Sequence, residues 1–134
     1  MMPLALTLTP SPFEMPITFA SRLARRNACT SLYAFSSDVG LDIRGLEIGN
    51  ETALKHLRQL ASLPPNTFAG TLASDQTKKS VRVGPEFYRS HTFIRHDVRF
   101  CPDCISNDIE KGGSFAHAVH RLHWQIGHIS TCHE

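Results

Sequence analysis

Three cysteines in the second half of the chain have residue types and spacing that suit a metal ion. Cys101 and Cys104 form a Cys-x-x-Cys pair, and Cys132 follows near the end of the chain. The two-residue spacer lets both thiolates face one ion at about 2.3 Å, while backbone N–H groups of the turn offset the negative charge on sulfur. A closed zinc site takes four such ligands. The spacing therefore predicts a structural zinc site held by Cys101, Cys104 and Cys132, with His128 or His133 as the candidate fourth ligand.

Other chemistries of the Cys-x-x-Cys pair are less well supported. A redox pair of the thioredoxin type is expected near a βαβ pattern, which this sequence lacks. A structural disulfide is disfavoured because the apolar N-terminal segment has no basic region typical of an export signal. Two inert buried cysteines remain an open alternative, and Cys29 is expected to be a small core or surface residue.

The remaining histidines are less informative. All but His56 lie after residue 75, and His117, His120 and His123 recur at every third position. On a helix they would line one face, but the same stretch also suits a strand, which would turn His120 away from the other two. A second metal site at these histidines is therefore possible but not favoured. Trp124 is expected to be the large apolar core residue of the zinc-binding part of the chain.

The sequence carries no recognisable catalytic motif. It has no phosphate-binding Gly-rich loop ending in Lys-Ser/Thr, no Gly-x-Ser-x-Gly and no His-Glu-x-x-His, and its acidic residues are scattered. A zinc-dependent hydrolase or deaminase would also need a general base, such as the Glu of a His-x-Glu motif, which does not occur before Cys101. We therefore expect a protein that is not an enzyme.

Composition and charge describe an ordinary globular chain. Of 134 residues, 41% are apolar and 19% charged, and 14 basic against 12 acidic residues give a formal charge of +2. This balance excludes nucleic-acid binding by bulk charge, although a local basic face stays open. No run of about 18 apolar residues indicates a transmembrane helix. We expect a cytoplasmic protein with no membrane partner.

The chain is expected to contain two structural units. Cysteine and histidine are concentrated in the second half, which predicts a helical unit over 1–74 and a zinc-binding module over 75–134. The small, polar segment 73–80 is typical of a linker. Within the module, 81–84 alternates like a short strand, and 92–100 predicts a strand that runs into the Cys-x-x-Cys pair.

The first unit has the signals of several short helices. Apolar residues at helical spacing predict a helix over 15–28, Ser31 and Gly40 mark the ends of a second, and Asn50 caps a third over 51–61. A short helix over 66–72 is also expected. The fold class is thus mainly α: a helix-turn-helix-like bundle followed by a small α+β module of the zinc-knuckle or ribbon type.

One helical turn of the first predicted helix concentrates positive charge. Its three arginines are expected opposite the apolar stripe, as a solvated face or as contacts to nucleic-acid phosphates. The candidate nucleic-acid-binding residues are Arg22, Arg25 and Arg26.

Several segments, in order, resemble the TniQ family, transposition-associated target-selection factors of bacterial mobile elements. Phe100 to Ile105, FCPDCI, resembles the family's fCPxCL knuckle. RLHWQ at 121–125 followed by TCH at 131–133 resembles its R-x-x-W…C-P-x-H segment. The start of the chain, from Pro12 to Asn27, is similar to the family's P-x-x-E-S-x-x-S-W-x-x-R-L-A-x-x-N, and LA at 60–61 and TL at 71–72 also match. Together these segments cover nearly the whole chain.

The chain also departs from the family pattern. Ile17 and Phe19 or their neighbours replace the usual serine and tryptophan, and His133 stands where the family has proline. The family's fourth zinc ligand would lie just beyond Glu134. The resemblance thus implies an N-terminal piece cut inside its zinc site, or a site in which His128 or His133 replaces the ligand.

The resemblance implies a DNA-transposition accessory protein with a structural zinc ion. Such a protein acts as an adaptor, linking target recognition, through DNA or a guide-RNA effector complex, to an AAA+ ATPase that activates the transposase. The family also allows a homodimer. The alternative is a DNA-binding transcription regulator built from the helix-turn-helix and zinc-finger units.

Overall fold

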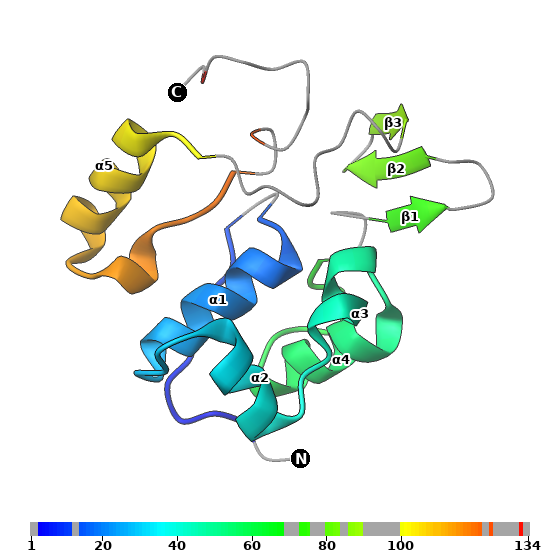
Figure 1. Cartoon of the computed structure of the whole chain (residues 1–134), viewed down its shortest axis with the longest axis horizontal. Helices are drawn as coiled ribbons and strands as arrows, with labels where there is room; N and C mark the ends of the chain where they lie inside the picture. Colours follow the sequence, from blue (N-terminus) through cyan, green and yellow to red (C-terminus); the bar gives the residue numbers. More distant parts are fainter. Residues whose placement is uncertain are drawn as a thin grey trace.

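A computed structural model of the chain describes residues 3–11, 14–68, 73–75, 80–83, 86–89, 100–121, 124 and 132. Its mainly helical architecture agrees with the sequence prediction. Helix α1 lies at the centre, with α2, α3 and α4 packed around it and α5 and the 3₁₀ turn η1 beyond it (Figure 1). None of the helices within these ranges combines the length and the apolar character needed to cross a lipid bilayer.

Helix α1 spans Pro16–Arg26, close to the predicted range. Pro16 occupies the first turn, where its missing N–H leaves no hydrogen bond unmade and its fixed φ suits the helix. Phe19, Ala20 and Leu23 are fully buried. The predicted helix runs two residues too far at this end, because α1 ends at Arg26 and Ala28 is exposed.

The caps inferred from the sequence end α2 and begin α4 as predicted. Helix α2 spans Leu32–Val39, where the Ser31 side chain accepts the Ala34 N–H and Gly40 ends the helix at a φ of 70°. Helix α4 spans Glu51–Leu60, and the Asn50 side chain accepts the N–H groups of Thr52 and Ala53. Each cap satisfies backbone donors that the first helical turn leaves unpaired.

Helix α3, Ile43–Ile48, was not predicted, because six residues are too few to show a helical period. Its N-cap is Asp42, and it packs closely on α4: a Cβ on Gly45 would lie 2.8 Å from that of Ala53. The helix expected over 66–72 is wrong for its described part, since 66–68 form a turn, and the rest lies outside the described residues.

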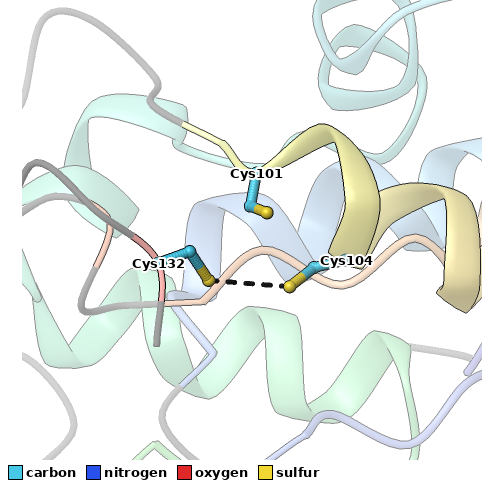
Figure 2. A group of neighbouring side chains, drawn as sticks. All are labelled: Cys101, Cys104 and Cys132. Carbon is cyan, nitrogen blue, oxygen red and sulfur yellow. Dashed lines mark hydrogen bonds between the residues drawn. The ribbon is translucent and has the colours of Figure 1, made fainter. Parts of the chain in front are cut away.

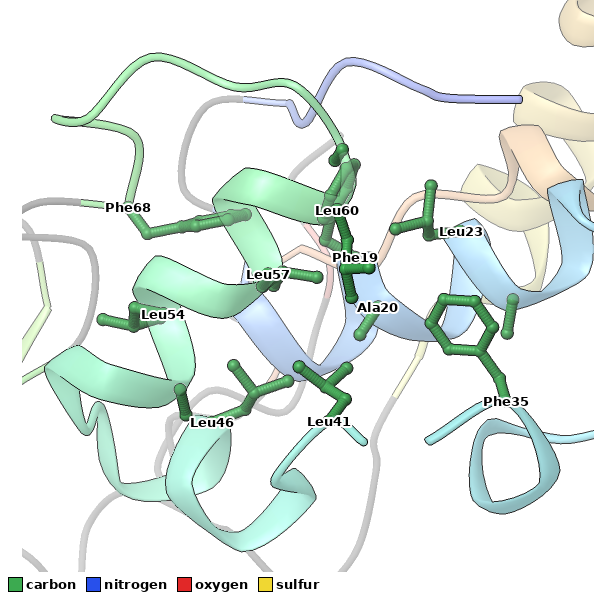
Figure 3. Close-up of a cluster of buried hydrophobic side chains, with 13 residues drawn as sticks. Phe19, Ala20, Leu23, Phe35, Leu41, Leu46, Leu54, Leu57, Leu60 and Phe68 are labelled. Atoms are coloured by element: carbon green, nitrogen blue, oxygen red, sulfur yellow. The ribbon is translucent and has the colours of Figure 1, made fainter. Parts of the chain in front are cut away.

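The core lies between the first four helices (Figure 3). It is almost entirely aliphatic and aromatic, and Phe68, at the end of the helical unit, packs its ring 5.6 Å from that of Phe19. Burial of this continuous apolar surface is the main stabilising term of the helical unit.

A small sheet follows the helices. Strands β1 (Ala73–Asp75), β2 (Ser80–Val83) and β3 (Glu86–Arg89) pair antiparallel in that order. Strand β2 matches the predicted strand at 81–84, but 73–80 is not simply a linker, because it contains β1 and the first residue of β2. The strand predicted over 92–100 falls almost wholly outside the described residues. The division at 74/75 remains a prediction.

Helix α5 spans Pro102–Gly112, and η1 spans Phe115–His117. Gly113 ends α5 at a φ of 79°, and Gly112 packs so tightly that a Cβ there would lie 2.2 Å from the His117 side chain. The turn η1 packs in turn on α1, which places the C-terminal part of the chain against the helical unit.

Candidate metal centre

The three cysteines singled out in the sequence converge on one point. The sulfur atoms of Cys101, Cys104 and Cys132 all lie within 4.8 Å of one another, and those of Cys104 and Cys132 are 3.6 Å apart (Figure 2). Thiolates that share one tetrahedral ion at the usual Zn–S bond length stand about 3.8 Å apart. The Cys104–Cys132 distance is close to this value, and the three sulfurs could hold a metal ion.

The start of α5 positions the Cys-x-x-Cys pair. Cys101 is the N-cap and Cys104 the third helical residue, with Pro102 between them in the first turn. The positive end of the helix dipole therefore faces the two sulfurs and stabilises the negative charge of thiolates bound to a cation. Cys104 is buried, whereas Cys101 and Cys132 are half-buried.

Trp124 supports the third cysteine. Its indole Nε1–H donates to the Cys132 sulfur at 3.5 Å, and the side chain is buried as expected of an anchor. The His120 ring packs edge-on against Trp124 at 5.3 Å, and the Arg121 guanidinium lies 5.4 Å from the same ring. A donor to sulfur spreads the charge of a thiolate ligand, as hydrogen bonds around metal ligands generally do.

Asp108 connects α5 to the segment that carries Trp124. Its carboxylate accepts two hydrogen bonds from the Arg121 guanidinium and one, at 2.9 Å, from the Val119 N–H. Burial opposes ionisation of Asp108, but these hydrogen bonds and the charges of Arg121 and Arg22 outweigh it and lower its pKa below the ordinary 3.8.

We expect Asp108→Asn to destabilise the protein by about 1–2 kcal/mol at pH 7, because the amide loses the charge-assisted bonds to Arg121. A lowered folded-state pKa gives stability that is present above the unfolded pKa, near 3.8, and lost as the pH falls through the folded value. The difference in unfolding free energy between the unaltered chain and Asp108→Asn, measured with urea from pH 7 to pH 3, should therefore shrink below about pH 4. A difference that grows at acid pH would contradict this assignment.

The histidine row does not form a metal cluster in the part of the chain that the structure describes. His117 ends η1 and shares a hydrogen bond with Ser114, whereas His120 is buried against Trp124. His123 and the candidate ligands His128 and His133 lie outside the described residues.

Arg22 does not share the exposed face of α1 with Arg25 and Arg26, so its expected placement was wrong. It is only 7% exposed, and its Nε and Nη2 donate to both carboxylate oxygens of Glu14, at 2.8 and 2.9 Å. Its remaining bonds reach the carbonyls of Thr9 (3.1 Å) and Ala116 (3.0 Å). Four of its five N–H groups are thus used within the protein and its charge is paired with Glu14, whereas Arg25 and Arg26 are exposed.

The sequence offered a signal for this burial. Arg22 stands three residues after Phe19 and one before Leu23, hence on the inner side of the helix, and Glu14 lies upstream as a partner. Cys29 is half-buried and packs at the edge of the helical core, within the range expected for it.

The geometry defines a class of protein: helices packed around a central α1, with three cysteines beside α5 that could hold a metal ion. The TniQ family model matches residues 5–134, nearly the whole chain, and the chain therefore belongs to the TniQ family. The family is associated with transposition. No curated protein and no solved structure matches the chain.

Proposed function

We propose that this protein is a non-catalytic accessory factor of DNA transposition, an adaptor between target recognition and an AAA+ ATPase that activates the transposase. The observation that carries the proposal is the family match over residues 5–134. The absence of a catalytic motif from the sequence agrees with it. An adaptor of this kind acts in the cytoplasm.

The metal we propose is a structural zinc ion bound by Cys101, Cys104 and Cys132. Three thiolates are a soft donor set typical of closed zinc sites. His128, His133 or a residue beyond Glu134 would complete the four ligands. Zinc would crosslink the start of α5 to the returning chain, which compensates for the small core of this module.

Target recognition would involve the exposed part of the α1 surface. Arg25 and Arg26 lie in the last turn of α1 and are exposed, so they are available to the phosphates of DNA or of a guide-RNA effector complex. Arg22 is left out of this proposal because its guanidinium is bonded within the protein.

Co-purification tests the adaptor role. We expect the zinc-loaded chain to retain the AAA+ ATPase of a TniQ-type transposition system, and deletion of the chain's own gene to abolish targeted transposition in cells. Arg26→Glu should reduce target binding but not ATPase retention. Failure to retain the ATPase, combined with sequence-specific DNA binding by the chain alone, would instead support the transcription-regulator alternative.

A further inference from the structure

An open groove of about 360 Å³ lies between α1 and residues of α5, η1 and their flanking segments. Thr18, Ser21 and Arg25 line one side from α1, and Phe100, Phe115 and Trp124 line the other. Its volume is large enough for one or two large side chains of a partner.

Two aromatic rings at this groove are exposed without an evident structural reason. Phe100 is 62% and Phe115 69% exposed. Single exposed apolar residues are ordinary, but two phenylalanines at one hollow form the kind of surface that marks a binding site. Aromatic side chains of this kind are enriched among the residues that dominate binding energy.

The charge of the groove is complementary to a carboxylate. Among the residues that the structure describes, its lining contains Arg22 and Arg25 but no aspartate or glutamate. Arg22 is neutralised by Glu14, whereas Arg25 is exposed and makes no ion pair with any described residue. One unpaired cation beside apolar walls suits a single acidic side chain better than a nucleic-acid backbone, which needs a row of cations.

Residues next to the three cysteines line one wall of this groove. Phe100 directly precedes Cys101, Ile105 directly follows Cys104, and Trp124 donates its indole N–H to Cys132. The positions of these side chains therefore depend on the three cysteines being held together.

We infer that the groove binds a short acidic and apolar segment of a protein partner, with a large apolar side chain between Phe100 and Phe115 and a neighbouring carboxylate on Arg25. The inference deepens the proposed adaptor function and rests on it for the identity of the partner. It also makes binding of the partner segment depend on the metal, because a chain without metal would lose one wall of the binding site.

The test is selection of displayed peptides of about twelve residues on the full, zinc-loaded chain. We expect enrichment of peptides with Asp or Glu within about four positions of a large apolar residue, the reach of one helical turn or a short extended segment. A synthetic copy of the most enriched peptide should bind about tenfold more weakly to Phe115→Ser and to Arg25→Glu, as for residues central to an interface. Removal of the metal by chelation should abolish binding.

Two matched variants control for general effects of surface changes. Tyr33 is 76% exposed on α2 and Arg44 is exposed on α3, so Tyr33→Ser and Arg44→Glu should bind the peptide like the unaltered chain. Enrichment of basic peptides, no enrichment, or equal binding by Phe115→Ser would overturn the inference. The inference would also be overturned if a labelled oligothymidine bound in the same groove and bound more weakly to Phe115→Ser. The peptide experiments contain no ATPase. Their failure would therefore not contradict the adaptor role, which the co-purification test addresses separately.

Discussion

Cys104→Ser should release the metal and unfold the C-terminal module while the helical unit stays folded. Cys104 is the buried member of the trio, and a serine hydroxyl is a poor replacement for a thiolate ligand. Structural zinc contributes about 10–16 kcal/mol of apparent binding free energy in zinc-finger peptides. The binding free energy lost with one ligand should therefore exceed the folding stability of so small a module. Native mass spectrometry should find about one zinc per unaltered chain and none in the variant.

Amide hydrogen exchange locates the expected damage. Amides of α5 and η1 should lose protection in Cys104→Ser, whereas those of α4, which lies in the continuous core of the helical unit, should keep it. Cys29→Ser is the matched control, since Cys29 is half-buried and lies outside the trio. A folded, metal-free natural chain, or metal retained equally by both variants, would refute the site.

The cysteine trio could be predicted because its information is local and chemical. A Cys-x-x-Cys pair constrains two sulfurs by itself, and a third cysteine near histidines supplies further donors of the kind that zinc prefers. The helix caps were equally readable, since Ser31, Gly40 and Asn50 each act within a few residues of their own position.

What the sequence did not reveal depends on contacts between distant residues. The Asp108–Arg121 pair joins two segments whose separation follows from no local rule. Arg22 looked like one of three equivalent surface charges, yet it hydrogen-bonds to Ala116 across 94 positions of the chain. Charge type alone does not distinguish a buried arginine from a solvated one; only its position relative to Phe19 and Leu23 does.

The bonds of Arg22 also explain how the two predicted units are joined. One guanidinium binds the N-terminal segment at Thr9, the carboxylate of Glu14 and the backbone of η1 at Ala116. Glu14 in turn accepts the Ser11 N–H at 3.0 Å. The buried Arg22–Glu14 pair is therefore one of the contacts that hold η1 on the α1 bundle.

Arg22→Met should destabilise the helical unit by about 3–5 kcal/mol, because it leaves the carboxylate of Glu14, which is 1% exposed, buried without its cation. Methionine preserves most of the side-chain volume, so the loss reflects charge and hydrogen bonds more than a cavity. Urea unfolding followed by circular dichroism measures the change. Arg25→Met, an exposed change one turn further along the same helix, should stay within about 0.5 kcal/mol of the unaltered chain.

The double variant Glu14→Gln with Arg22→Met separates the two roles of this pair. Removing the stranded charge should restore much of the lost stability, since replacing both partners of a buried ion pair costs less than breaking it. The hydrogen bond to Ala116 is not restored, however, so η1 should still exchange its amides faster than in the unaltered chain. If stability and protection of η1 recover together, Arg22 stabilises only its own helix. If stability recovers and protection does not, the bond from Arg22 to Ala116 helps to hold η1 on α1.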